Sequence, residues 1–139
     1  MPVLMLHDLI ESSRQGLLSQ NSPYLLSIKT ITEVVLQPNI RYQHINEQLE
    51  IGAFTTLFTC DDGGGSSILL AELLKSYNLL CIFFIPTSFV DLPQFLSKSE
   101  IVYIRSLGHL IGSHSCTHLH PFCYQKPSLI FKEVRESTM

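Results

Sequence analysis

Strand-length apolar runs alternate with longer stretches in which apolar residues recur at helical spacing. The runs that predict strands lie at residues 3–6, 53–60, 79–85 and 107–113. Helices are predicted at residues 28–36, from Ser66 or Ser67 to about Asn78, at 92–106 and at 128–136, with a short helical turn at 45–50. Because strand and helix alternate in this way in parallel βα units, the sequence predicts an α/β fold.

The same spacing predicts which helix faces are buried. Ser27 is placed to cap the first helix, and Pro38 follows its end. A glycine turn at 63–65 precedes the second helix and is expected to be flexible. The residues expected to face the core are Ile28, Ile31 and Val35 in the first helix, Ile68, Leu69, Leu73 and Leu74 in the second, and Leu129, Ile130 and Val134 in the last.

Composition narrows the classes of function. The chain has 139 residues, enough for one domain with a core of its own. Its formal net charge of −3 offers no basic footprint for nucleic acid. With 45% apolar and 15% charged residues, the chain suits strands that are buried on both faces. The 4 cysteines show no CxxC spacing, so no disulfide framework is predicted.

No segment predicts insertion into a membrane or transport across one. The longest strongly apolar run, 79–85, is far shorter than the about 20 residues that cross a bilayer. The first residues do not contain a basic segment followed by a long apolar one. No signal peptide is therefore predicted, and a cytoplasmic location is the default.

Two short motifs carry chemistry, and each follows its own predicted strand. Asp61 and Asp62 are adjacent, and His114 and His118 are four residues apart, which on a helical turn would bring both imidazoles to one face. The carboxyl ends of parallel strands meet at one edge of the sheet, where ligands bind. One carboxylate and two imidazoles are the ligands of an open divalent-metal site of the zinc type. The spare carboxylate beside them would accept a proton from water.

Three other histidines are candidates for supporting roles. His120 follows the second motif closely and is an alternative to His118 as a ligand. His109 is expected to pack, or to support a ligand from behind, rather than to bind metal. His7 ends the first predicted strand, so it would lie on the same rim.

These motifs resemble those of the polysaccharide deacetylases, also called the NodB-homology or carbohydrate esterase 4 family. Its Thr-Phe-Asp-Asp-Gly is similar to Thr59-Cys60-Asp61-Asp62-Gly63, and its His-Ser/Thr-x-x-His is matched by residues 114–118. Residues 108–113 resemble its Gly-His-Glu-Ile-Gly-Ser, with leucine in place of glutamate, and 80–86 resemble its Ala-Thr-Phe-Phe-Val strand. Residues 2–7 are similar to the Pro-Val-Leu-Met-Tyr-His opening of a branch that acts on cell-surface glycans.

The resemblance implies a distorted (β/α) barrel and a metal-dependent hydrolase that removes acetyl groups from acetylated polysaccharides or oligosaccharides. It implies that Asp61 is the catalytic base. It also implies that Asp62, His114 and His118 bind a divalent metal, zinc in the first place, with cobalt or nickel as alternatives. Because family members often work at the cell surface or in the periplasm, the compartment stays open.

The sequence departs from the family pattern after His118. The family's Arg-x-Pro segment, and its Leu-x-His whose histidine protonates the leaving amine, do not follow in the residues that remain. Residues 1–139 are therefore interpreted as an incomplete domain of this type, a partial barrel of about the first four βα units. Such a piece would expose an open sheet edge through which copies associate.

Three hypotheses follow from these observations. The chain is a metal-dependent deacetylase, or it is a catalytically dead remnant that acts as a metal- or glycan-binding module. The third is an unrelated small metal-binding α/β protein. Convergence of Asp62, His114 and His118 at first-shell distance would remove most of the weight from the third.

Overall fold

Four parallel strands form one sheet in the computed structural model, which describes residues 2–18, 21–48 and 55–138. They lie side by side in chain order. Their bounds are β1 Val3–Leu6, β2 Leu57–Cys60, β3 Cys81–Ile85 and β4 Leu110–Ser113. Because each neighbouring pair is parallel, the carboxyl ends share one edge of the sheet. The predicted α/β class is confirmed.

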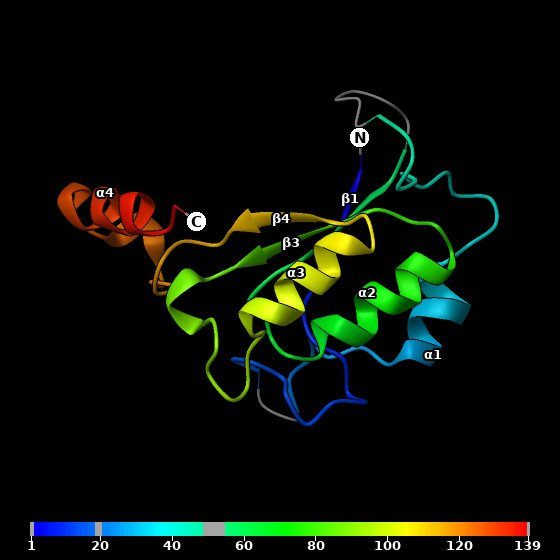
Figure 1. Cartoon of the computed structure of the whole chain (residues 1–139), viewed down its shortest axis with the longest axis horizontal. Coiled ribbons are helices and arrows are strands. Elements are labelled where there is room, and N and C mark those ends of the chain that lie inside the picture. The colour runs from blue at the N-terminus through cyan, green and yellow to red at the C-terminus, as the bar shows by residue number, and fades with distance from the viewer. Residues whose placement is uncertain (1, 19–20, 49–54, 139) are drawn as a thin grey trace.

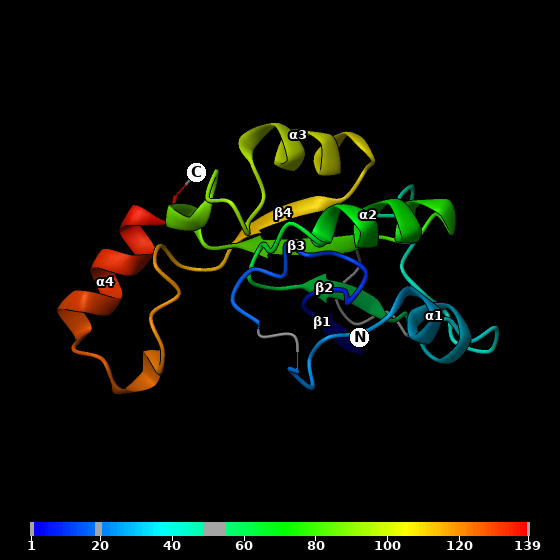
Figure 2. The ribbon, with the colours of Figure 1, turned by 90° about the horizontal axis from the view of Figure 1, so that it is seen from below.

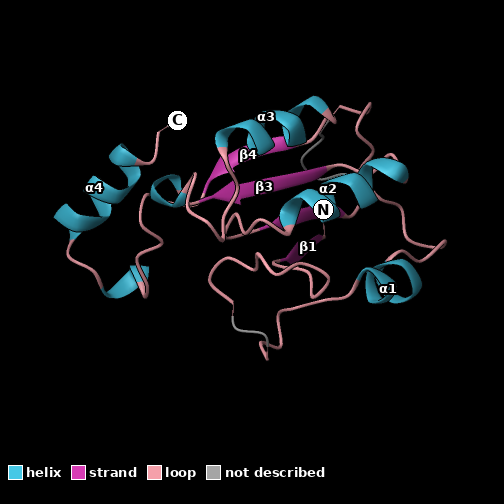
Figure 3. Cartoon of the chain, turned by 60° about the horizontal axis from the view of Figure 1, so that its bottom comes forward, coloured by secondary structure: helices cyan, strands magenta, loops and turns pink. Residues whose placement is uncertain are grey.

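Two helices cover one face of this sheet. α2 (Ser67–Ser76) and α3 (Lys98–Ser106) lie on the same side of the strands (Figures 1, 2 and 3). α1 (Ile28–Thr30) continues directly into the π-helical turn η1 (Ile31–Val35). The remaining elements are η2 Thr87–Phe89, η3 Phe122–Tyr124 and α4 Pro127–Glu136. Within the described residues, no helix has the length and apolar character that a membrane span needs.

The core lies between the sheet and these helices. Every residue of β2 is buried, as expected for a central strand. On α2 the fully buried apolar residues are Leu70, Ala71 and Leu74. Of the predicted face, Leu74 is confirmed as fully buried, whereas Ile68, Leu69 and Leu73 are partly buried and pack against the core. On the first helical segment the prediction is confirmed: Ser27 accepts a hydrogen bond from Thr30 N–H, and Ile31 is fully buried with Ile28 and Val35 packed against the core.

Several predicted boundaries differ from those of the structure. The helix predicted at 92–106 begins only at Lys98, because Ser97 and Glu100 form a capping box there. β4 begins at Leu110 rather than at 107. The helical turn predicted at 45–50 is a hydrogen-bonded turn in which Glu47 N–H donates to the His44 carbonyl. Residues 49–54, which include the predicted start of the second strand, lie outside the described residues.

The last helix differs most from its prediction. α4 lies beyond the carboxyl ends of β3 and β4, apart from the other helices (Figure 1). The expected burial of its apolar face is wrong for Leu129 and Val134, which are 36% and 57% exposed, whereas Ile130 is partly buried. The buried residue is Glu133, at 5% exposure. Among the described elements, no sheet face lies beneath these apolar residues (Figure 1), and the carboxylate of Glu133 attaches the helix to residues 116 and 117 instead.

Candidate metal centre

The acidic half of the site follows β2. Asp61 is the first residue beyond the strand, and its N–H donates to the Leu6 carbonyl at 3.0 Å. Asp62 then takes a left-handed backbone conformation with φ 69°, which aspartate tolerates better than most residues. Leu96 N–H closes the turn by donating to the Gly63 carbonyl at 3.0 Å. These contacts bury Asp62 at the end of the strand, at 5% exposure.

Glycines let the chain turn inside the core. Gly63 has φ 62°, and a Cβ there would lie 2.9 Å from Ile85 Cγ2. A Cβ at Gly64 would lie 2.1 Å from Asp8 Oδ1. The turn that was expected to be flexible is therefore buried and closely packed. Only residues without a side chain fit these two positions.

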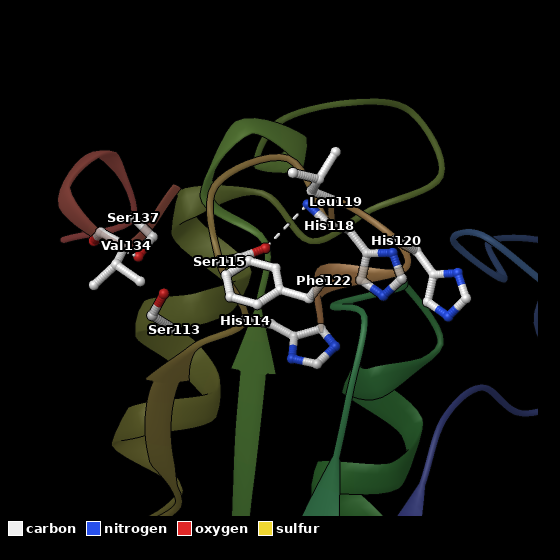
Figure 4. A pocket seen from close by; sticks show the side chains of 9 residues that line it. All are labelled: Ser113, His114, Ser115, His118, Leu119, His120, Phe122, Val134 and Ser137. Carbon is white, nitrogen blue, oxygen red and sulfur yellow. Dashed lines mark hydrogen bonds between the residues drawn. The ribbon is translucent and has the colours of Figure 1, made fainter. Parts of the chain in front are cut away.

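The histidine half follows β4. His114 N–H extends the strand pairing by donating to the Ile85 carbonyl at 3.0 Å. The expected helical turn does not form, because Ser115 and His118 have φ values of 64° and 53°. His118 N–H donates to Ser115 Oγ at 3.1 Å (Figure 4). This bend still brings the two imidazole rings together, with centroids 5.1 Å apart.

The side chains of Asp62, His114 and His118 converge. Asp62 Oδ1 lies 3.3 Å from His114 Nε2 and 3.0 Å from His118 Nε2. The candidate ligand atoms of the three residues all lie within 4.8 Å of one another. Asp62 Oδ1 is a buried oxygen that has no hydrogen-bond partner of proper geometry among the described residues. A carboxylate oxygen that faces two imidazole nitrogens fits a zinc-type cation with a fourth position left open.

The electrostatics of the two aspartates differ. Burial acts to raise the pKa of Asp62, but the imidazoles of His114 and His118 outweigh it and hold the pKa below its ordinary value. Asp62 in turn raises the pKa of His114. Burial raises the pKa of Asp61, whose Oδ1 is likewise buried without a partner in the described part of the chain. Asp61 is thus a stronger proton acceptor than an exposed aspartate.

The other candidate histidines lie in different settings. His109 is 2% exposed, and its Nε2 donates to the Ala71 carbonyl at 2.9 Å while its Nδ1 accepts from Cys81 N–H at 3.3 Å. It is a packing residue between α2 and the sheet, not part of the converging cluster. His120 is exposed beyond the bend. His7 packs against Tyr24, with ring centroids 5.3 Å apart, and it is one of the groups that act against burial to lower the pKa of Asp61.

A cavity of about 590 Å³ opens beside the two converging histidines (Figure 4). Its volume is within the range of small-molecule sites, about 300–1,000 Å³. It is lined by Ser113, His114, Ser115, His118, Leu119, His120, Phe122, Val134 and Ser137. The cavity therefore joins polar side chains of the bend to apolar ones of the segment that follows.

Glu133 was not among the residues singled out in the sequence. Its carboxylate accepts hydrogen bonds from the N–H groups of Cys116 and Thr117, between the two histidines. Burial acts to raise its pKa, but these hydrogen bonds outweigh it and lower the pKa. In the sequence it stands among apolar residues of an amphipathic helix, where an acid normally marks the solvent face. Nothing in the neighbouring sequence therefore predicts that Glu133 is buried.

Comparison with known proteins gives structural matches without sequence matches. No protein-family profile matches the chain, and no curated protein sequence does. The Streptococcus pyogenes deacetylase PplD, solved in complex with acetate, superposes with a TM-score of 0.70 at 14% identity, over 99% of this chain and 65% of PplD. IcaB from Ammonifex degensii gives 0.64 at 16% identity, over 99% of this chain and 66% of IcaB.

A polysaccharide deacetylase from Bacillus cereus gives a TM-score of 0.64 at 18% identity, over 99% of this chain and 47% of that protein. The chain thus spans about two thirds or less of the length of these proteins. At such identities the similarity concerns the fold. Over the part that it spans, this chain has the α/β fold of the polysaccharide deacetylases.

Proposed function

We propose that this chain carries the metal-binding half of a deacetylase site, in a stretch that spans about two thirds or less of the deacetylases it matches. The proposed reaction is the removal of acetyl groups from an acetylated polysaccharide or oligosaccharide. One observation carries the proposal: Asp62, His114 and His118 converge at the strand ends of a deacetylase fold. This convergence also argues against an unrelated small metal-binding protein.

The residues divide the chemistry between them. Asp62, His114 and His118 would hold a divalent cation, with zinc preferred and cobalt or nickel as alternatives, because imidazole and carboxylate ligands suit these ions. Such a cation supplies Lewis-acid polarisation of an acetyl carbonyl and makes water more acidic. Asp61 would accept the proton of the attacking water, since its buried oxygen is free and its pKa is raised.

The cavity beside the histidines is the proposed place of the acetylated sugar. Leu119, Phe122 and Val134 supply apolar surface, and His120 is a rim residue on its wall. His7 would support the acidic half of the centre, since it is one of the groups that act against burial to lower the pKa of Asp61. We place no nucleic acid or membrane among the partners.

A catalytically dead metal- or glycan-binding module is the second candidate. This candidate keeps the three converging ligands and the cavity, and it would bind metal without turnover.

Self-association through open sheet edges is a further part of the proposal. β1 and β4 each have one strand neighbour in the described sheet. Val3 and Met5 of β1 are 52% and 59% exposed, and Leu110 of β4 is 43% exposed. Exposed apolar edge strands are sites where another chain can pair.

Metal binding and acetate release test the proposal separately. Purified protein should bind Zn²⁺ or Co²⁺ in titration calorimetry. His118→Ala should abolish binding, whereas His120→Ala should keep it. With metal, the protein should release acetate from acetylated chitooligosaccharides, and Asp61→Asn should lower the rate about 10²-fold or more while metal stays bound. Metal binding without acetate release would favour the binding module, and absence of metal binding would contradict both the deacetylase and a metal-binding module.

A further inference from the structure

α4 directs a carboxylate into the histidine half of the candidate metal centre. Glu133 is 5% exposed, although Phe131 and Val134 on the same helix are 68% and 57% exposed. Burying an acid while apolar neighbours stay in solvent is unfavourable unless hydrogen bonds compensate the carboxylate. The buried carboxylate of Glu133 therefore requires specific hydrogen-bond donors.

Those partners are the groups between the two histidines. Glu133 Oε2 accepts from Cys116 N–H at 3.0 Å and from Thr117 N–H at 2.8 Å. Glu133 Oε1 accepts from Thr117 Oγ1 at 2.7 Å. Both oxygens of the Glu133 carboxylate thus accept hydrogen bonds from two consecutive residues, Cys116 and Thr117. Hydrogen bonds to an ionised acceptor are stronger than those between neutral groups.

The carbonyl side of the same bend is held by the η2 segment. Thr87 N–H donates to the Ser115 carbonyl at 3.2 Å. The Cys116 carbonyl accepts from Ser88 N–H at 3.0 Å and from Ser88 Oγ at 2.7 Å. The bend is therefore held from two sides. The η2 segment donates hydrogen bonds to its carbonyls. Among the hydrogen bonds described for Cys116 and Thr117, Glu133 is the only acceptor of their N–H groups.

These contacts matter because the backbone of the bend is in an unfavourable conformation. Ser115 and His118 have φ values of 64° and 53°, a region that non-glycine residues rarely occupy. Backbone of this kind persists only where its surroundings determine it. His118 depends directly on it, since its ring leaves the chain at one of these residues.

We infer that Glu133 is a positioning residue of the metal centre, whose carboxylate fixes the bend so that His114 and His118 present their imidazoles together to a divalent cation. This inference rests on the proposed function, because it takes the two histidines as ligands. Groups that orient ligands from behind typically change metal affinity by about 10–100-fold when they are removed. Glu133 would orient the two histidines through the backbone N–H groups of Cys116 and Thr117.

Metal affinity and the spectrum of bound Co²⁺ test this role. Glu133→Ala should lower Zn²⁺ affinity by about 10–100-fold and alter the visible absorption of bound Co²⁺. Glu133→Gln keeps the length and one acceptor oxygen, so it should recover part of the affinity. Glu136→Gln is the matched control on the same helix. Its side chain pairs only with Arg135 among the described contacts, at 3.7 Å, and it should match the wild type.

The bend itself can be followed without metal. In the metal-free protein, the amides of Cys116 and Thr117 should exchange with solvent faster in Glu133→Ala than in Glu136→Gln. Glu133→Ala that binds Zn²⁺ within twofold of the wild type, with an unchanged Co²⁺ spectrum, would overturn the inference and leave the proposed function standing. A wild type that binds neither ion would overturn both.

Discussion

The two halves of the candidate metal centre are built in different ways. The acidic half is held from within, since Asp62 is 5% exposed and the glycine turn beside it fits directly against Ile85 and Asp8. The histidine half is held from outside. The side chain of His118 is 29% exposed, and its bend is fixed by hydrogen bonds from η2 and α4.

This difference predicts two kinds of mutant. A change in the acidic half disturbs the packed body of the protein, so stability and metal binding should fall together. A change in the histidine half disturbs an outer bend, so metal binding should fall while the body stays folded. The predictions below test this separation, beginning with the largest expected effect.

Gly63→Ala should lower the free energy of unfolding by about 2–4 kcal/mol. The new Cβ would meet Ile85 Cγ2 at 2.9 Å on a backbone with φ 62°, and both overpacking and a left-handed non-glycine residue are costly. Urea unfolding followed by circular dichroism measures the loss. Lys132→Ala, an exposed change on α4, is the control and should stay within about 0.5 kcal/mol of the wild type. Wild-type stability of Gly63→Ala would show that the turn is not packed as described.

Asp8 should make the acidic half sensitive to pH. Burial raises its pKa from 3.8 to about 6, opposed by the hydrogen bond from Ser66, with Asp62 and His7 as the charged neighbours. Between these two pH values the folded chain binds more protons at Asp8 than the unfolded chain does. The stability due to Asp8 is therefore full below about pH 4 and is lost as the pH rises through about 6, by about 2–3 kcal/mol.

Asp8→Asn isolates this contribution. From pH 4 to pH 7 the wild type should lose about 2–3 kcal/mol relative to the variant, because asparagine does not titrate. Urea unfolding of both proteins across this range measures the difference. Two curves that stay parallel would contradict the assignment of the buried charge to Asp8.

Ser115→Ala should have the smallest effect on stability and still weaken metal binding. It removes the acceptor of His118 N–H, at 3.1 Å, from an outer bend. The free energy of unfolding should change by less than about 0.5 kcal/mol, whereas Zn²⁺ affinity should fall roughly tenfold. Ser128→Ala, at an exposed position on α4, serves as control for both measurements. A fall in stability as large as that of Gly63→Ala would remove the distinction between the two halves.

Much of the acidic half and the parallel βα arrangement of the strands was predictable from sequence. Asp61 and Asp62 directly follow a strand-length apolar run, and His114 follows another. Parallel strands bring such positions to one edge, so the general location of the site follows from local patterns. The helix predicted at 128–136 also has almost the bounds of α4.

The hydrogen-bond contacts around these residues could not be predicted from local sequence patterns. Glu133 is 16 positions from Thr117 and 17 from Cys116, and Asp8 is 58 from Ser66. Hydropathy spacing assigns an acid to solvent, and only a distant hydrogen-bond donor reverses that assignment. The same holds for the bend at 115–118, where spacing alone favoured a helical turn.

The alternation of strands and helices and the residue types at the strand ends follow from local patterns, because both depend on periodicity and on neighbours along the chain. Packing of the whole chain was needed to bring Asp62 Oδ1 to two imidazole nitrogens, to turn Gly63 and Gly64 inside the core and to place Glu133 against the histidine bend. These are contacts between residues far apart in sequence, and such contacts exist only once the chain has packed.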